Sequence, residues 1–236
     1  MFSHRKYILF DMDGTLIDSV GIWNLVDETL IARLRRDGKQ GVENVQQRRD
    51  ELLRQFRETP QPYMAYCGFL KDEYAMAETP QEIHDVRYAI ATELLTQHID
   101  YKPGADTLLR RLREQGHVLA LVSATARKNM EVYRQRNENI RSKAPIDGTF
   151  SLVYTREDAP AMKPDPAIYR MALTALEAKP AECLVFEDSL AGVEAAKNAG
   201  LTVAAMYDKY SDGEREQINA LADYTFESFA EVLDKL

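Results

Sequence analysis

The order of apolar and polar residues divides the chain into an opening strand, a helical stretch and a longer alternating stretch. Tyr7-Ile8-Leu9-Phe10 is an apolar run that ends directly at Asp11. A short, continuous run of this kind is typical of a strand that is buried on both faces in a parallel sheet. We therefore predict that the chain opens with a central strand whose end carries polar side chains.

The stretch that follows shows only helical patterns. Apolar residues recur at helical spacing over residues 22–34, and a second amphipathic segment lies between Glu43 and Arg57. Thr79-Pro80-Gln81-Glu82 then has the form of a capping box that opens another amphipathic helix. Because an exclusively helical block does not easily belong to a parallel sheet, we predict an inserted all-helical domain at residues 18–99.

From residue 101 onward, apolar strand patterns alternate with amphipathic helices, which is the pattern of a doubly wound sheet. The predicted fold class is therefore α/β, with a Rossmann-like parallel sheet core formed by residues 1–17 and 100–236. Ser228-Phe229-Ala230-Glu231 has the form of a second capping box before the last helix. The predicted strands cover residues 117–122, 150–154, 183–186 and 202–206, and two of the predicted helices cover residues 167–176 and 190–199.

The composition of the 236 residues is that of an ordinary globular protein, with 45% hydrophobic and 29% charged residues. The net charge of −8 and the scattered basic residues argue against a nucleic acid or an anionic membrane surface as a partner. Cys67 and Cys183 are far apart, which argues against a disulfide framework and a zinc site. The N-terminus shows no long apolar leader, so we expect a cytoplasmic protein, with a monomer as the default.

Several polar residues stand just past the predicted strands, where a parallel sheet gathers them into one crevice. Asp11 and Asp13 share one side of the first strand's end, because side chains alternate along a strand. Taken singly, the aspartates could form a turn, Ser123 could cap a helix, and Lys163 could lie on the surface. The residues that follow later strands or begin a helix are Ser123, Lys163, Glu187 and Asp188.

Together these residues predict a site for a metal ion and a phosphate group. Carboxylates gathered in one crevice repel one another unless a cation lies among them. Mg²⁺ prefers carboxylate and water oxygens and is the expected cofactor. Ser123 and Lys163 would then provide the hydrogen-bond donor and the positive charge that hold a phosphate beside the metal.

Four motifs, taken in order and spacing, resemble the signature of the haloacid dehalogenase-like hydrolase superfamily. The resemblance spans the whole predicted core. A helical block inserted after the first motif is similar to the cap of the subgroup that contains β-phosphoglucomutase and small sugar-phosphate phosphatases. The motifs are Asp11-Met12-Asp13-Gly14-Thr15, Ser123, Lys163-Pro164-Asp165-Pro166 and Glu187-Asp188-Ser189-Leu190-Ala191-Gly192.

The resemblance implies phosphoryl transfer through two aspartates. Asp11 would be the nucleophile that forms an aspartyl-phosphate, which splits one difficult displacement into two easier ones. Asp13 would protonate the leaving oxygen and then deprotonate the attacking water, a role that requires a carboxyl group of raised proton affinity.

The resemblance also implies how the other motif residues bind metal and phosphate. Mg²⁺ would be held by Asp11, the backbone carbonyl of Asp13 and Asp188. Glu187 would be either a direct ligand or a partner of the ligands. The phosphoryl oxygens would be bound by Ser123, Lys163 and the backbone N–H of Ala124.

The expected activity is the Mg²⁺-dependent hydrolysis of a small phosphorylated metabolite, such as a sugar phosphate. A dehalogenase would need neither Asp13 as a general acid nor a metal-binding pair at Glu187 and Asp188. A phosphomutase would use the same core, but the histidine in the first cap helix of β-phosphoglucomutases is replaced at the corresponding position by Trp23. A phosphometabolite-binding protein without catalysis is a third alternative, although every motif residue is present.

Substrate recognition is expected in the helical domain. A cap that closes over the crevice excludes water and limits the substrate to a small molecule. The linkers near residues 16–19 and 99–104 are the expected hinges. Each candidate for substrate recognition could instead be an ordinary surface or core residue of a helix. These candidates are Arg48, Arg49, Tyr63, Tyr66 and Lys71.

Overall fold

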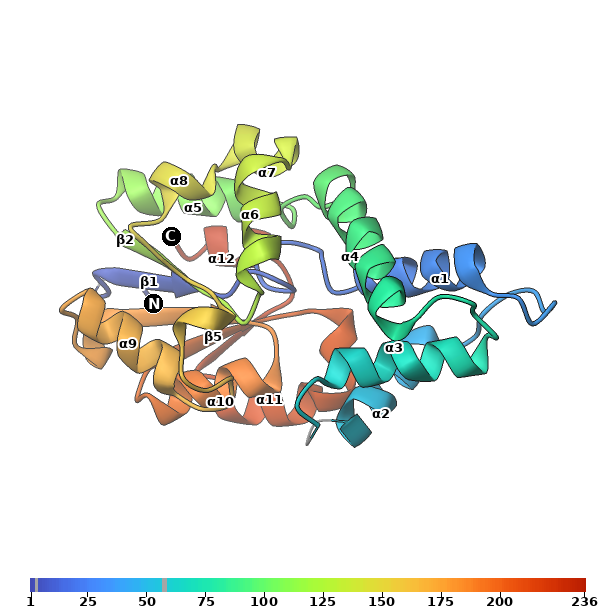
Figure 1. The fold of residues 1–236 in the computed structure, drawn as a ribbon. Helices are drawn as coiled ribbons and strands as arrows, with labels where there is room; N and C mark the ends of the chain where they lie inside the picture. Colours follow the sequence, from blue (N-terminus) through green and yellow to red (C-terminus); the bar gives the residue numbers. More distant parts are fainter. Residues whose placement is uncertain (3, 57–58) are drawn as a thin grey trace. The chain divides into compact units, whose positions relative to one another are not determined.

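The computed structural model describes residues 1–2, 4–56 and 59–236 (Figure 1). These residues form two compact units, of which one comprises Met1–Val20 and His98–Leu236 and the other Gly21–Gln97. The first unit is built on a β-sheet, and the described part of the second unit contains helices and loops. Arg57, the predicted end of the second amphipathic segment, lies outside the described residues.

The first unit, which we call the α/β unit, contains a sheet of six parallel strands in the order β3-β2-β1-β4-β5-β6. This is the order of a doubly wound, Rossmann-like sheet. The predicted fold class, with its inserted all-helical block, is therefore confirmed. The strands are β1 (Tyr7–Phe10), β2 (Val118–Val122), β3 (Leu152–Tyr154), β4 (Cys183–Glu187), β5 (Thr202–Met206) and β6 (Tyr224–Phe226).

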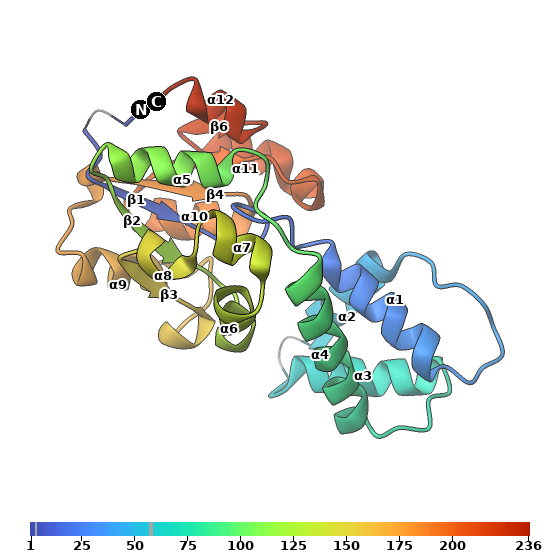
Figure 2. The ribbon, with the colours of Figure 1, turned by 90° about the horizontal axis from the view of Figure 1, so that it is seen from above.

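Helices cover both faces of the sheet. Figure 1 shows α5 and α12 on one face and α9, α10 and α11 on the other, and Figure 2 gives the view from above. Among the described residues, no helix is both long and apolar enough to cross a membrane. The helices of the α/β unit are α5 (Ala105–Glu114), α6 (Arg127–Gln135), α7 (Glu138–Lys143), α8 (Ile146–Thr149), α9 (Ala167–Ala175), α10 (Leu190–Asn198), α11 (Arg215–Leu221) and α12 (Phe229–Leu233).

Both faces of the central strands are buried, which explains their continuous apolar sequence. Leu9 of β1 packs in one cluster with Tyr169 of α9. On the opposite face, the rings of Phe10 and Phe186 stack with their centroids 4.9 Å apart, and Phe186 also meets Phe229 of α12. Alternate residues of each strand therefore anchor helices on opposite sides, and the strand ends are left to carry polar groups.

The second unit, which we call the helical unit, consists of α1 (Ile22–Leu34), α2 (Val45–Phe56), α3 (Pro62–Glu73) and α4 (Pro80–Gln97) within its described residues. Apolar side chains of these helices form a core of their own that includes Val26, Leu30, Leu70, Ile83 and Ile90. The predicted capping box at the start of α4 is confirmed, because Thr79 and Glu82 exchange hydrogen bonds in both directions.

One local prediction for the α/β unit was wrong, and some of its short elements were not predicted individually. The second capping box does not form, because Ser228 makes no side-chain cap and Glu231 accepts from the N–H of Glu227 instead, at 3.1 Å. The short helices α7 and α8 and the strand β6 were not predicted. Asn137, whose side chain accepts from the N–H of Ile140 at 2.9 Å, caps α7 and was the available signal.

Candidate active site

The end of β1 meets the end of β4 at the centre of the sheet. The N–H of Asp11 donates to the carbonyl of Phe186 at 3.0 Å, so the two strands stay paired up to their last residues. β1 and β4 are parallel, but the chain adds strands toward one edge of the sheet before β4 and toward the other edge from β4 onward. Doubly wound sheets bind ligands at the point where this order of addition reverses. The fold therefore places Asp11 beside Glu187 and Asp188.

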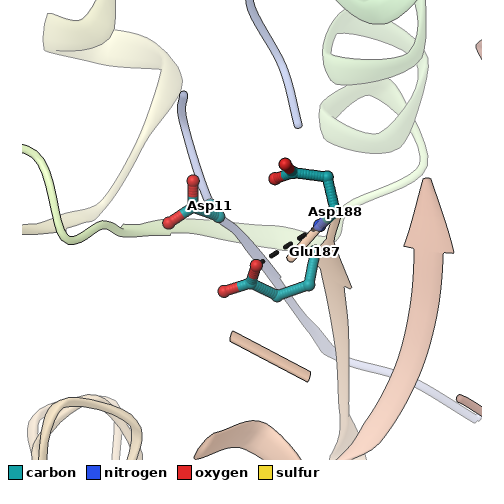
Figure 3. Close-up of side chains that lie close together, drawn as sticks. All are labelled: Asp11, Glu187 and Asp188. Atoms are coloured by element: carbon teal, nitrogen blue, oxygen red, sulfur yellow. Dashed lines mark hydrogen bonds between the residues drawn. The ribbon is translucent and has the colours of Figure 1, made fainter. Parts of the chain in front are cut away.

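These three residues, Asp11, Glu187 and Asp188, form an acidic cluster (Figure 3). One carboxylate oxygen from each lies within 4.8 Å of the others, and all three side chains are buried. Burial, and then the charges of Glu187 and Asp11, raise the pKa of Asp188 well above its usual value. Burial also raises the pKa of Glu187. The cluster is thus a place where negative charge is costly without a cation.

A tight turn after β1 brings the chain against Asp188. Gly14 has a φ of +85°, and a Cβ at this position would lie 2.3 Å from Oδ2 of Asp188. Glycine is therefore required both for the backbone conformation and for the close approach. The next residue, Thr15, donates its hydroxyl to Oδ1 of Asp188 at 2.6 Å and orients that carboxylate.

Lys163 is buried and joins the acidic cluster to the neighbouring strand. Its Nζ donates to Oδ1 of Asp11 at 2.7 Å, to Oε1 of Glu187 at 2.6 Å and to the carbonyl of Val122 at 3.0 Å. Burial opposes the charged form, but the two carboxylates outweigh it and raise the pKa of Lys163 well above its usual value. This lysine is therefore a fixed positive charge and not a mobile surface group.

Glu187 is held from several sides. Tyr169 of α9 donates its hydroxyl to Oε1 at 2.6 Å, the same oxygen that Lys163 contacts. The start of α10 lies so close that a Cβ at Gly192 would be 2.0 Å from Oε2. Ser189 caps α10 by accepting from the N–H of Gly192 at 3.1 Å. Glu187 thus fixes the ammonium group of Lys163 in front of Asp11.

Asp13 has a different environment made of hydroxyl groups. Its Oδ1 accepts from Ser19 at 2.5 Å and from Tyr133 at 2.8 Å, and its Oδ2 accepts from Thr125. Burial raises the pKa of Asp13, although the three hydroxyl groups partly oppose this. Asp11 and Asp13 therefore differ in their partners, one bound to an ammonium group and the other to hydroxyl groups.

Ser123 follows β2 and is buried. Its N–H donates to the carbonyl of Tyr154, and its Oγ lies 2.9 Å from Oγ1 of Thr125. The N-cap residue of α6 is Ala126, so the interpretation of Ser123 as a helix cap is wrong. Ala124, between the two hydroxyl residues, is exposed.

All five residues predicted to recognise substrate have contacts inside the helical unit, and Arg48 pairs with Glu73 at 3.4 Å. Arg49 pairs with the buried Asp27 at 3.1 Å, and Tyr66 is buried. Lys71 donates to the backbone carbonyls of residues 76–78. Tyr63 is 38% exposed and the side chain of Arg48 is 51% exposed.

The structure also brings four unpredicted residues to the site, each through a hydroxyl group. Tyr133 and Tyr169 lie on the apolar faces of amphipathic helices, where the sequence pattern does not distinguish a site tyrosine from an ordinary core residue. Thr125 and Ser19 lie close to Ser123 and Asp13 in sequence, and their positions beside predicted site residues were the available signal.

The acidic cluster fits Mg²⁺ by its donor chemistry. All its ligand atoms are carboxylate oxygens, which a hard divalent cation prefers. Among the described residues, Lys163 is the one ammonium group bonded to this cluster, through Asp11 and Glu187, so two negative charges remain to be matched when all three carboxylates are ionised. A divalent cation at this place would supply the missing charge.

Comparison with known proteins is consistent with this geometry. A bifunctional riboflavin kinase/FMN phosphatase of Arabidopsis thaliana is 29% identical over 94% of this chain, which spans 55% of that protein. A phosphorylated carbohydrates phosphatase of Thermotoga maritima is 27% identical and matches over 82% of this chain and 81% of its own. The crystal structure of CbbY from Rhodobacter sphaeroides in complex with phosphate has the same fold, with a TM-score of 0.70 at 24% identity, over 97% of this chain and 96% of that one.

The comparison with family models gives the family directly. The model of the haloacid dehalogenase-like hydrolases matches residues 5–200, which include every strand from β1 to β4 and all four sequence motifs. The predicted enzyme class, a hydrolase, is thereby confirmed. The chain belongs to the haloacid dehalogenase-like hydrolase family, as its motifs predicted.

Proposed function

We propose that the protein is a Mg²⁺-dependent phosphatase that hydrolyses a small phosphorylated metabolite through an aspartyl-phosphate. The observation that carries this proposal is the position of Asp11. Its carboxylate belongs to the acidic cluster and also accepts a hydrogen bond from Lys163 at 2.7 Å. A nucleophile between a cation site and an ammonium group has positive charge on both sides to attract a phosphate.

The two aspartates divide the work of the reaction. An oxygen of Asp11 attacks phosphorus, the bond from phosphorus to the ester oxygen breaks, and Asp13 gives a proton to that oxygen. Asp13 then takes a proton from a water molecule, which attacks the phosphorus of the aspartyl-phosphate and releases inorganic phosphate. The raised pKa of Asp13 suits a group that must begin the reaction with a proton.

The remaining site residues bind and orient. Mg²⁺ would be held by the carboxylates of Asp11 and Asp188 and by the carbonyl oxygen of Asp13, and when bound it neutralises charge on the phosphoryl oxygens. Glu187 suits a supporting role, because Lys163 and Tyr169 both donate to it. The groups proposed to bind the phosphoryl oxygens are Ser123, Lys163 and the N–H of Ala124.

We assign the helical unit the role of a cap over this site. Its insertion directly after the β1 turn gives it the place in the chain from which a cap can control access. A sugar phosphate is the preferred substrate class, in line with the phosphatase of phosphorylated carbohydrates among the relatives. Tyr63 and Arg48 are the preferred contacts, because their side chains are exposed.

The proposal is tested by measuring phosphate release from 4-nitrophenyl phosphate and from a panel of sugar monophosphates, with Mg²⁺ and with EDTA. Turnover should require Mg²⁺. Asp11→Asn should lower kcat by about 10³-fold or more, because the nucleophile is lost. Asp234→Asn is the matched control, since Asp234 is exposed near the C-terminus and belongs to no part of the site.

Three outcomes would contradict parts of the proposal. Full activity of Asp11→Asn would remove the nucleophile assignment. Conversion of a sugar phosphate into its isomer in the presence of a sugar bisphosphate would assign a phosphomutase instead. Binding of phosphorylated metabolites without any turnover would assign a binding protein.

A further inference from the structure

The carboxyl group of Asp13 is held by three hydroxyl donors that come from separate parts of the α/β unit. Ser19 follows the β1 turn, Thr125 follows β2, and Tyr133 lies on α6. Two of them, Ser19 and Tyr133, donate to Oδ1 at 2.5 Å and 2.8 Å, whereas Thr125 donates to Oδ2. The two oxygens of this carboxyl group are therefore not equivalent.

The number of hydrogen-bond donors on each oxygen fits a protonated carboxyl group whose proton is on Oδ2. An sp² oxygen has two lone pairs, so two donors saturate Oδ1. Oδ2 has one donor, Thr125, and that hydroxyl group can also turn toward Oγ of Ser123 at 2.9 Å. Oδ1 thus has the bonding of a carbonyl oxygen, and Oδ2 is the oxygen that can carry a proton and hand it over.

Of the two donors on Oδ1, Tyr133 has the hydroxyl oxygen whose position is more firmly fixed. Its ring is 1% exposed within α6, so the position of its hydroxyl group is set by the packing of the helix. Ser19 is equally buried, but its Oγ moves with rotation about a single side-chain bond, and it lies two residues before the helical unit begins at Gly21. Tyr133 therefore fixes Oδ1 through the packing of α6, which does not depend on the segment that leads into the helical unit.

We propose that Tyr133 is a positioning residue that anchors Oδ1 of Asp13, so that Oδ2 is the oxygen that delivers the proton to the leaving group. This inference rests on the acid–base role that the proposed function gives to Asp13. Tyr133 lies outside the four motifs, on a helix whose sequence shows only an amphipathic pattern.

The test compares two esters of similar shape that differ in how much they need a proton. 4-Nitrophenyl phosphate releases a weakly basic phenolate, whereas phenyl phosphate releases a much more basic one that needs general acid help. Tyr133→Phe should lower kcat/KM for phenyl phosphate by about tenfold and for 4-nitrophenyl phosphate by less than about threefold. The ring stays in place, so the fold is preserved.

Tyr101→Phe is the matched control. It removes another buried tyrosine hydroxyl from the α/β unit, one that donates to the carbonyl of Ala144 at 2.5 Å. This change should affect both esters by the same factor, because it does not touch Asp13. An equal loss on both esters in Tyr133→Phe, or no loss on either, would overturn the inference.

Asp13→Asn separates a failure of this inference from a failure of the proposed function. It should show the same preference for 4-nitrophenyl phosphate as Tyr133→Phe, but larger. If Asp13→Asn shows the preference and Tyr133→Phe does not, Asp13 is the acid and Tyr133 does not position it. If Asp13→Asn slows both esters equally, the acid role of Asp13 is wrong and the inference falls with it.

Discussion

Glu187 occupies its buried position only because residue 192 has no side chain. A Cβ at Gly192 would lie 2.0 Å from Oε2 of Glu187, far inside an ordinary contact. The carboxylate has little freedom to move, since Lys163 and Tyr169 both hold Oε1 at 2.6 Å. A single methyl group on α10 would therefore act on the residue that anchors the lysine of the site.

We expect Gly192→Ala to lower the free energy of unfolding by about 1–3 kcal/mol, the usual cost of overfilling a packed site. It should also lower turnover, because a displaced Glu187 would draw Lys163 away from Asp11. Urea unfolding and phosphate release measure the two effects. Gly213→Ala is the control, since a Cβ there would meet nothing within 4 Å. An unchanged unfolding midpoint would show that Glu187 has room to shift.

The sequence predicted the charged residues of the site but not its tyrosines. Asp11 and Lys163 stand out because a charge directly follows an apolar strand or opens a helix, where position alone points to a crevice. Tyr133 and Tyr169 do not stand out, because a tyrosine on an amphipathic helix satisfies the hydrophobic pattern whether or not its hydroxyl group has a polar partner. Only the three-dimensional packing shows where that hydroxyl group points.

At the scale of elements, the residues that begin α4 could all be identified in the sequence. The N–H and the hydroxyl group of Thr79 donate to Oε2 of Glu82 at 2.7 Å and 2.8 Å, and the N–H of Glu82 donates back to Thr79 at 3.3 Å. Pro80 occupies the first helical position, where no N–H is needed. These bonds satisfy backbone N–H groups at the N-terminus of α4, the longest helix in the described part of the helical unit.

Stability should depend on this capping box in a pH-dependent way. Thr79→Ala should lower the free energy of unfolding by about 1 kcal/mol. The backbone N–H and then the hydroxyl group of Thr79 lower the pKa of Glu82. A carboxylate with a lowered pKa in the folded state stabilises the fold above its unfolded pKa of about 4.3, and this contribution is lost as the pH falls.

The difference in melting temperature between the wild type and Glu82→Gln should therefore be largest near neutral pH and should vanish toward pH about 3. Thermal unfolding at several pH values measures it. Glu93→Gln, an exposed position on the same helix, is the control and should show no such trend. A constant difference across the pH range would show that the charge of Glu82 adds nothing to the cap.

Helices and strands could be predicted where the sequence has a long amphipathic or apolar run. They could not be predicted where the element forms only through its tertiary contacts. β5 begins and ends where the apolar run at Thr202–Met206 does. β6 has three residues, two of them exposed, and is a strand because it pairs with β5. The second capping box has the right residue types, but Glu231 reaches the N–H of Glu227, a choice that depends on local geometry.

At the scale of the molecule, the two ends of the helical insertion are joined inside the α/β unit. Ile17 forms an antiparallel bridge with Tyr101, and the N–H of Lys102 donates to the carbonyl of Leu16 at 2.8 Å. The chain therefore leaves and re-enters the α/β unit at one place. Each unit also has a core of its own, so neither needs the other to bury its apolar side chains.

This arrangement predicts that the α/β unit folds alone. Replacing residues 21–97 by a short Gly-Ser linker should give a protein that unfolds cooperatively, because the linker joins two chain segments that already lie side by side. All residues of the acidic cluster remain, so Mg²⁺ at 100 times its Kd should stabilise the shortened protein by about 2.7 kcal/mol. Selectivity among sugar phosphates should be lost.

Thermal unfolding with and without Mg²⁺ checks the shortened protein, and Asp188→Asn in the same background is its control. The substitution keeps the shape of the side chain and removes the charge that the cluster offers to a cation, so the stabilisation by Mg²⁺ should disappear. Non-cooperative unfolding of the shortened protein would mean that the helical unit is needed to fold the sheet. A persistent Mg²⁺ effect in Asp188→Asn would place the cation elsewhere, because a divalent ion bound at the acidic cluster depends on that carboxylate.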